Sequence, residues 1–279
     1  EAKFMRISVI TAVYNSETVL GKSIASVATQ THGNLEHLII EGKSADRSLI
    51  AIRNSAHERM RLISEPDLGI YDALNKGIKN ATGDIIGFVH SDDYLAHDKV
   101  LARIANEFKD PTVDAVYSDL DYVSKANNEH VVRRWSNGPY RHGCLKNGWM
   151  PAHTTLYLRR SVFQNFGLFD TNYKISGDYD FILRYFSQTS GKSIYIPEVL
   201  YKMRLGGISN RNSKNIRLKM CEDLNAIRTN SVGGIKTLVF KNLSKINQFI
   251  IKPKQNNIIR TNANFSKIDK FDLQKSLGS

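Results

Sequence analysis

Cysteine is nearly absent from this chain of 279 residues, and its scarcity excludes two classes of protein. The two cysteines, Cys144 and Cys221, have neither the close spacing of metal ligands nor the number that a disulfide-stapled domain needs. We therefore expect two free thiols and a reducing compartment. The stability of the fold must then come from a buried apolar core, for which an apolar content of 41% is sufficient.

Long apolar runs are missing as well. No window approaches the roughly 18 consecutive apolar residues that mark a membrane-spanning helix, and residues 1–5 lack the apolar core of a signal peptide. These observations predict a globular protein of the cytosol.

Two common phosphate-binding motifs are also absent. No G-x-G-x-x-G sequence follows the first predicted strand, and no Walker lysine motif occurs in the chain. Dinucleotide-dependent dehydrogenases and P-loop kinases therefore lose their main support. If this protein binds a nucleotide, other residues must hold it.

The first hundred residues alternate strand-like and helix-like patterns. The predicted strands are 6–12, 35–40, 61–63 and 84–89, and the predicted helices are 15–30, 46–56 and 70–78. This alternation predicts a doubly wound, mostly parallel α/β sheet. Sheets of this kind bind ligands beyond the carboxyl ends of their strands, at the point where the strand order reverses.

The second half of the chain has a looser pattern. Residues 113–123 and 129–135 predict a hairpin, residues 154–158 a strand, and residues 178–188 a helix.

Two adjacent carboxylates, Asp92 and Asp93, follow the predicted strand 84–89. Two carboxylates at a buried strand end are costly unless a cation or a basic side chain compensates them, so the pair favours a divalent metal or a basic partner. The alternative is that Ser91, Asp92 and Asp93 form a solvated turn that caps a helix beginning near His97.

A series of short motifs gives the strongest functional signal. The motifs are residues 7–15, 41–46, 67–77, 83–84, 91–93 and 177–180. Together, over roughly residues 5–210, they resemble the family-2 inverting glycosyltransferases of the GT-A fold, of the bacterial surface-polysaccharide type. The resemblance implies transfer of a sugar from a nucleoside diphosphate donor, usually a UDP-sugar, assisted by Mn²⁺ or Mg²⁺.

The resemblance assigns a metal ligand. Asp92 matches the last acid of the family's D-x-D motif, the acid that faces the metal. A hard cation held by one or two carboxylates and by phosphate oxygens neutralises the charge that grows on a departing diphosphate. His90 occupies the first position of that motif, which contacts the ribose in relatives, so it is either a ribose contact or another partner of the diphosphate. Asp93 is expected to support the loop.

Further donor contacts are also implied by the resemblance. Glu41 occupies the position where relatives carry an Asp that faces the uracil ring, and the alternative is an exposed surface glutamate. The remaining residues expected to bind the nucleotide-sugar are Thr11, Tyr14, Asn15, Ser44, Asp67, Asn75 and Ser91.

Inversion requires a base that removes the proton of the acceptor hydroxyl. Asp178 matches the family's base, although Gly177 stands where a Glu normally precedes it. The helix dipole favours an ionised Asp178 whereas partial burial disfavours it, and the alternative role is an ordinary helix cap. On the acceptor side we expect His153, Trp149 and Asp180, each of which has a structural alternative.

Positive charge is concentrated at the end of the chain. Residues 1–201 contain 23 basic and 23 acidic residues, whereas residues 202–279 contain 16 basic and four acidic residues and so carry the whole net charge of +12. Within 232–250, apolar residues recur at helical spacing, with Lys236, Lys241 and Lys245 off that stripe. This pattern is typical of a helix that lies on anionic lipid, or equally of a helix packed on the catalytic domain.

We therefore expect residues 1–210 to form a GT-A catalytic domain and residues 211–279 a basic, amphipathic helical extension. Residues of about 5–100 would form the nucleotide-binding half, and residues of about 101–210 the acceptor-binding half.

The predicted function is transfer of a single sugar to a saccharide on polyprenyl diphosphate, during synthesis of O-antigen, capsule or exopolysaccharide. Such an enzyme would be cytoplasmic or peripheral on the inner face of the plasma membrane. The alternatives are a nucleotidyltransferase, which also uses carboxylates and Mg²⁺, and a basic nucleic-acid-binding module, which would leave the acidic strand ends unexplained. We expect no nucleic-acid partner.

Overall fold

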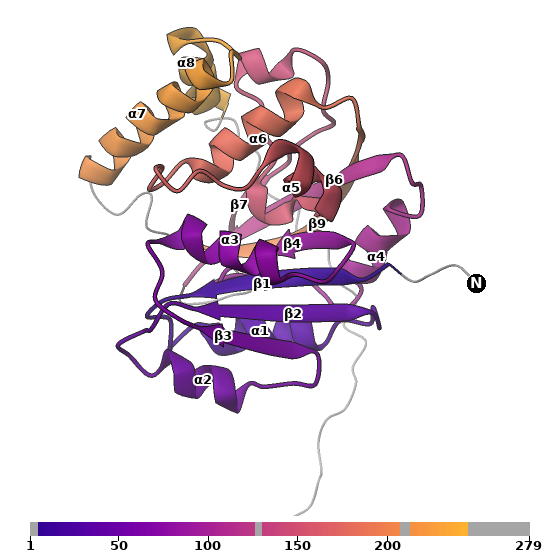
Figure 1. The fold of residues 1–279 in the computed structure, drawn as a ribbon. Helices are drawn as coiled ribbons and strands as arrows, with labels where there is room; N and C mark the ends of the chain where they lie inside the picture. Colours follow the sequence, from indigo (N-terminus) through magenta and orange to yellow (C-terminus); the bar gives the residue numbers. More distant parts are fainter. Residues whose placement is uncertain (1–4, 126–129, 207–212, 245–279) are drawn as a thin grey trace, which may run out of the picture.

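The structure is a computed structural model that describes residues 5–125, 130–206 and 213–244 (Figure 1). A single nine-stranded sheet runs through these residues, in the order β3-β2-β1-β4-β8-β6-β9-β5, and β7 pairs with β6. The mixed α/β architecture with a largely parallel first half confirms the predicted fold class.

The first half of the sheet consists of parallel strands, as predicted. They are β1 (Ile7–Val13), β2 (Leu35–Glu41), β3 (Met60–Ser64) and β4 (Ile85–Phe88). Residues of β1 and β2 are buried along their whole length, because helices cover both faces of the sheet. On one face, Leu38 and Ile40 pack with Leu74 of α3 (Ile70–Asn80), and on the other, Ile39 packs with α1 (Leu20–Ala28) and α2 (Ser48–Asn54).

One predicted helix start is wrong. The first helix begins at Leu20 and is capped by neither Asn15 nor Ser16. Asn15 instead adopts a left-handed backbone conformation with a φ of 48°, which bends the chain out of β1 and delays the helix.

The second half is built on two long strands that lie side by side. Strand β6 (Val113–Val123) forms the predicted antiparallel hairpin with β7 (Val131–Trp135) and also pairs in parallel with β9 (Lys192–Arg204), a strand that the sequence pattern did not predict. The predicted strand 154–158 is instead a 3₁₀ turn, η2 (His153–Thr155), followed by β8 (Tyr157–Arg159). The other elements are β5 (Tyr94–Leu95), α4 (Val100–Glu107), η1 (Cys144–Asn147), α5 (Arg160–Phe166) and α6 (Gly177–Gln188).

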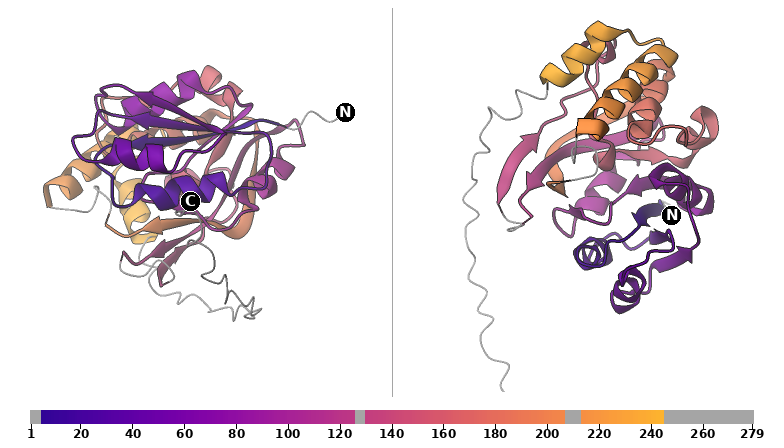
Figure 2. Two further views of the ribbon diagram at one scale, coloured as in Figure 1. Left: turned by 90° about the horizontal axis from the view of Figure 1, so that it is seen from below. Right: turned by 90° about the vertical axis from the view of Figure 1, so that its left-hand side faces the viewer.

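Two C-terminal helices, α7 (Ser213–Thr229) and α8 (Ile235–Ser244), lie against α6 and η1 (Figure 2). Leu238 is buried, whereas Ile235, Val239 and Leu243 are exposed, so most of the predicted apolar stripe is not packed on the rest of the described chain. Lys241, predicted to lie on the polar side, is only 1% exposed. Helix α8 therefore packs on η1 and α7 by one side, contact of its other side with lipid stays a prediction, and the stripe beyond Ser244 lies outside the described residues.

Among the residues that the structure describes, no helix has the length and apolar character needed to cross a membrane.

Candidate active site

The loops that follow β1 and β2 are tied together at the carboxyl edge of the sheet. The backbone N–H of Asn15 donates to Ser44 Oγ at 3.0 Å, and Asn15 Oδ1 accepts from the N–H of Ala45 at 2.9 Å. Tyr14 projects from the same edge and is 62% exposed. Asn15 and Ser44 therefore fix the shape of this edge of the sheet, which we call the rim, and the aromatic ring of Tyr14 is exposed there.

Glu41 is buried at the end of β2, which excludes the exposed surface glutamate. Its carboxylate accepts the N–H of Ser44 at 2.5 Å and the hydroxyl of Ser64 at 2.6 Å. Burial alone would raise the pKa of Glu41, but these hydrogen bonds outweigh it and lower the pKa. Glu41 is therefore an ionised carboxylate that joins the loop after β2 to β3, and its contact with a base stays a prediction.

Asp67 lies at the same rim, with its side chain over Gly42 in the loop after β2. Its Oδ1 accepts the N–H of Gly69 at 2.9 Å and so fixes the turn that leads into α3.

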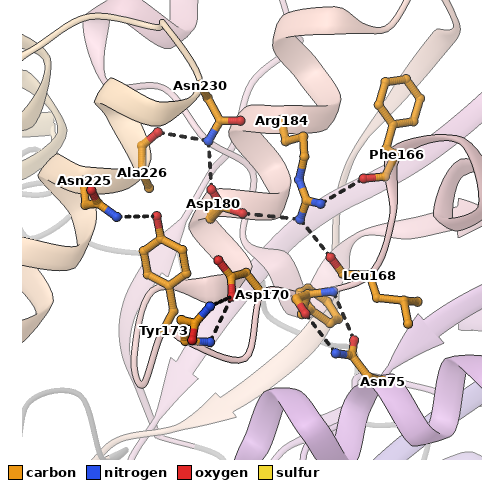
Figure 3. Close-up of polar contacts among 12 residues, drawn as sticks. Asn75, Phe166, Leu168, Asp170, Tyr173, Asp180, Arg184, Asn225, Ala226 and Asn230 are labelled. Atoms are coloured by element: carbon orange, nitrogen blue, oxygen red, sulfur yellow. Dashed lines mark hydrogen bonds and ion pairs between the residues drawn. The ribbon is translucent and has the colours of Figure 1, made fainter.

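Two residues predicted to contact the donor are placed elsewhere. Thr11 is fully buried within the sheet, and its hydroxyl lies 3.0 Å from His37 Nε2, so it cannot reach a ligand. The buried amide of Asn75 donates to the carbonyl of Phe169 at 2.8 Å and accepts its N–H at 3.0 Å (Figure 3). Asn75 therefore joins α3 to the segment that precedes α6.

The two carboxylates after β4 have different environments. Asp93 is 2% exposed and accepts the backbone N–H of Arg204 at 3.0 Å, and its burial together with the charge of Asp92 raises its pKa well above the usual range. Asp92 is partly exposed and makes no hydrogen bond or ion pair within the described residues. Ser91 Oγ lies 3.0 Å from Ser16 Oγ, which connects this loop to the β1 loop.

This donor set fits a metal that arrives with its substrate. No group of three His, Cys, Asp or Glu among the described residues could hold a metal alone. Mg²⁺ in phosphate sites usually takes one or two carboxylates, and phosphate oxygens and water complete its shell. The carboxylate of Asp92, which has no partner among the described residues, is suited to be this metal ligand. The buried Asp93 already accepts a hydrogen bond from the backbone of Arg204.

A chain of polar contacts connects the end of β4 to Asp178. His90 Nε2 lies 2.8 Å from His153 Nε2, and His153 Nδ1 lies 2.9 Å from Asp178 Oδ2. On its other side, the hydroxyl of the buried Tyr71 lies 3.0 Å from Asp178 Oδ1. Tyr71 was not among the residues predicted for the site, and its only signal in the sequence is its place in the third motif, one helical turn before Asn75.

The charges along this chain follow from burial. Burial would raise the pKa of Asp178, but the adjacent His153 outweighs it and holds the pKa well below the usual range. Burial and the neighbouring His153 lower the pKa of His90 to about 3, so His90 is neutral at physiological pH. Asp178 is thus an ionised carboxylate in a defined orientation.

Trp149, predicted to face the acceptor, makes structural contacts. The indole N–H of Trp149 donates to the carbonyl of Asn137 at 2.7 Å, and its ring packs in an aromatic cluster with Tyr117, Tyr140 and Phe186.

Asp180 is buried and turned toward α7 (Figure 3). Its carboxylate accepts the side-chain N–H of Asn230 at 2.8 Å and pairs with Arg184 at 3.3 Å. Asp180 thus connects α6 to the end of α7. Because both of its carboxylate oxygens already have partners, it is not available to an acceptor.

Several solved structures share this fold. S. aureus TarS 1–349 in complex with UDP-GlcNAc superposes with a TM-score of 0.60 at 17% identity, covering 80% of this chain and 66% of that chain, just under two thirds. The mannosyltransferase PcManGT from Pyrobaculum calidifontis, in complex with GDP-Man and Mn²⁺, gives a TM-score of 0.61 at 18% identity, covering 90% and 71%. At these identities the likeness shows the GT-A fold alone.

Sequence comparison is more specific. A PGL/p-HBAD biosynthesis glycosyltransferase of Mycobacterium bovis is 31% identical over 209 residues, which span 73% of this chain and 78% of the relative. An uncharacterized glycosyltransferase of Nostoc sp. is 29% identical over 221 residues, covering 75% and 67%. Residues 8–167 match the family described as glycosyl transferase family 2. The chain is therefore a glycosyltransferase and belongs to glycosyl transferase family 2.

Proposed function

We propose that this enzyme transfers a single sugar, with inversion, from a nucleoside diphosphate sugar to a lipid-linked saccharide in the synthesis of a surface polysaccharide. The observation that carries the proposal is the contact chain from His90 through His153 to Asp178. Through these contacts the side chain of His153 connects the ionised carboxylate of Asp178 to His90, which lies in the same loop as Asp92.

In this proposal Asp178 is the base. The acceptor hydroxyl oxygen attacks the anomeric carbon, the bond from that carbon to the diphosphate breaks, and the hydroxyl proton passes to Asp178. The contacts from Tyr71 and His153 hold the carboxylate in one orientation, so that no rearrangement is needed at the moment of proton transfer. Asp92 would hold Mn²⁺ or Mg²⁺, which when bound would neutralise charge on the leaving diphosphate.

A UDP-sugar is the first donor to test. Two structural neighbours are described as complexes with UDP or UDP-GlcNAc and another as a complex with GDP-Man, which supports a nucleoside diphosphate donor without selecting the base. Tyr14, Glu41 and Asp67 line the rim on which the base would lie.

A polyprenyl diphosphate acceptor is consistent with the surface of α8. Ile235, Val239, Phe240 and Leu243 are each between 47% and 62% exposed, and apolar side chains on a helix in a basic segment favour an anionic lipid surface. The proposal therefore places the enzyme at the inner face of the plasma membrane, where such acceptors would be presented to it.

A panel of UDP- and GDP-sugars, each with Mn²⁺ or with a chelator, tests the proposal by thermal stabilisation and by slow donor hydrolysis. We expect one donor to raise the melting temperature only with metal, and hydrolysis to release the nucleoside diphosphate. Asp178→Asn should abolish hydrolysis and leave nucleotide binding nearly unchanged. Absence of stabilisation and of hydrolysis across the panel would refute the proposal, and release of pyrophosphate would indicate a nucleotidyltransferase.

A further inference from the structure

We infer that α7 and α8 are part of the catalytic unit, because Glu222 and Asp223 of α7 position the segment 174–178 that carries Asp178. This inference rests on the proposed role of Asp178 as the base. It assigns positioning residues to a helix that the sequence analysis placed in a separate extension.

Glu222 holds the backbone just before Asp178. Its carboxylate accepts the N–H groups of Lys174, Ile175 and Ser176, each at 2.8 Å. Ser176 is the residue that precedes the first turn of α6, and its own side chain does not cap that helix. A carboxylate at this place satisfies three amides of the loop that enters α6, the last of them at the N-cap residue, and opposes the positive end of the helix dipole. Glu222 thus fixes the backbone that leads into α6 from another helix.

Asp223 holds the same segment by a side chain. The hydroxyl of Ser176 donates to Asp223 Oδ1 at 2.8 Å, while Oδ2 pairs with Lys219 at 2.8 Å and with Lys241 of α8 at 2.7 Å. Burial would raise the pKa of Asp223, but the two ammonium groups outweigh it and lower the pKa. The Lys241 ammonium also lies 3.3 Å from the centre of the Tyr179 ring. Lys241 therefore connects α8 to both Asp223 and α6.

Tyr71 holds the segment from the opposite side. Its hydroxyl lies 2.7 Å from the carbonyl of Ile175 and 3.0 Å from Asp178 Oδ1. The ring fits there because residue 177 is glycine, since a Cβ at that position would come within 2.9 Å of Tyr71 Cδ2. Helices α3 and α7 thus contact the segment 174–178 from two sides. The last residue of this segment, Asp178, is the proposed base.

The charges of the C-terminal helices also favour the ionised form of Asp178. After His153, the positive charges of Lys219 and Lys241 lower the pKa of Asp178, and the groups that face its carboxylate directly are His153 and Tyr71. The C-terminal helices therefore orient the segment that carries Asp178, and their two lysines favour its charged form.

The test compares the full-length protein with Glu222→Gln and uses Glu58→Gln, a substitution of an exposed glutamate, as the matched control. A glutamine presents one carbonyl oxygen to three amides and turns its NH₂ group toward them, so the segment should shift. We expect kcat for donor hydrolysis to fall about tenfold to hundredfold, since misplacement of a reacting group by about 1 Å can cost 10²-fold. The KM for the donor and the Kd for UDP should stay within about twofold of the wild-type values.

Hydrogen exchange supplies a second measurement on the same proteins. The amides of residues 174–176 should exchange faster in Glu222→Gln than in Glu58→Gln, while amides of β1 stay protected. A wild-type kcat in Glu222→Gln, or an equal loss of kcat and UDP affinity, would overturn the inference and leave the proposed function intact. If the wild-type protein hydrolyses no nucleotide-sugar, the proposed function fails, and the positioning role fails with it.

Discussion

The imidazole of His153 connects two parts of the fold, since its Nδ1 lies 2.9 Å from Asp178 and its Nε2 lies 2.8 Å from His90. His153 comes from η2 and Asp178 from the first turn of α6, so neither element alone creates the pair. The contact both orients the carboxylate and favours its charged form.

Replacement of His153 by Gln should therefore lower kcat without loss of the nucleotide. Because the imidazole contact that orients the Asp178 carboxylate is removed, we expect a decrease of about tenfold or more in kcat and an unchanged Kd for UDP. The measurement is steady-state hydrolysis together with calorimetry. The exposed His142, replaced by Gln, is the control, and equal kcat values for the two variants would contradict the prediction.

Asp92 and Asp93 offer a matched pair for the metal. Asp92→Asn should abolish the stabilisation that Mn²⁺ adds in the presence of UDP, because it removes the one carboxylate of the pair without a partner in the described chain. Asp93→Asn should retain it, since burial already favours the neutral acid at that position. Thermal unfolding with and without Mn²⁺ distinguishes the two variants, and loss of the metal effect in Asp93→Asn alone would reverse the assignment.

Binding to lipid should depend on the exposed side of α8. Substitution of Val239, Phe240 and Leu243 by Ser should reduce co-sedimentation with anionic liposomes several-fold while the melting temperature changes little, because these side chains are about half exposed. Ile50→Ser removes an equally exposed apolar side chain from α2 and should have no effect. Equal recovery of all three proteins, or of wild type with and without liposomes, would argue against a lipid surface.

The stability of the fold should fall as the pH decreases below about 6.5. Burial lowers the pKa of the fully buried His37 from 6.5 to about 3, so between these values the unfolded chain binds a proton that the folded chain does not. Stability rises with pH wherever the unfolded state binds more protons, by up to about 1.4 kcal/mol per pH unit for one group.

Urea unfolding at pH 7.5, 6.5 and 5.5 checks this prediction. His37→Gln should show a smaller loss of unfolding free energy between pH 6.5 and 5.5 than the wild type, whereas the exposed His142→Gln should match it. Parallel pH dependences for His37→Gln and wild type would show that His37 does not contribute.

The parts of the fold that could be predicted are those whose pattern is local. Strands β1 and β2 are continuous apolar runs, and α3 has apolar residues at helical spacing, so each could be read from neighbouring residues alone. The first helix start was wrong because a polar Asn at a strand end suits a left-handed turn as well as a helix cap. Strand β9 was missed because it is only partly buried and contains Pro197.

The candidate site could be predicted only in outline. The motifs pointed to the loops after β1, β2 and β4 and to Asp178, and the structure brings the carboxyl ends of β1 and β2 to one rim. The hydrogen-bond partners of these side chains could not be predicted, because the two residues of each pair lie far apart in the sequence. Thr11 bonds to His37, and Asp180 bonds to Asn230. A side chain's type shows that it needs a partner but does not identify that partner.

The close approach of Gly148 and Lys241 has a consequence for inhibition. Gly148, with a φ of 78°, follows η1, and its Cα faces the backbone of α8 so closely that a methyl group there would overlap Lys241. A small molecule that bound between η1 and α8 and separated them would withdraw the Lys241 ammonium group from Asp223 without touching the rim at which the nucleotide is proposed to bind. Its potency would then be independent of the donor concentration, unlike that of a nucleotide analogue.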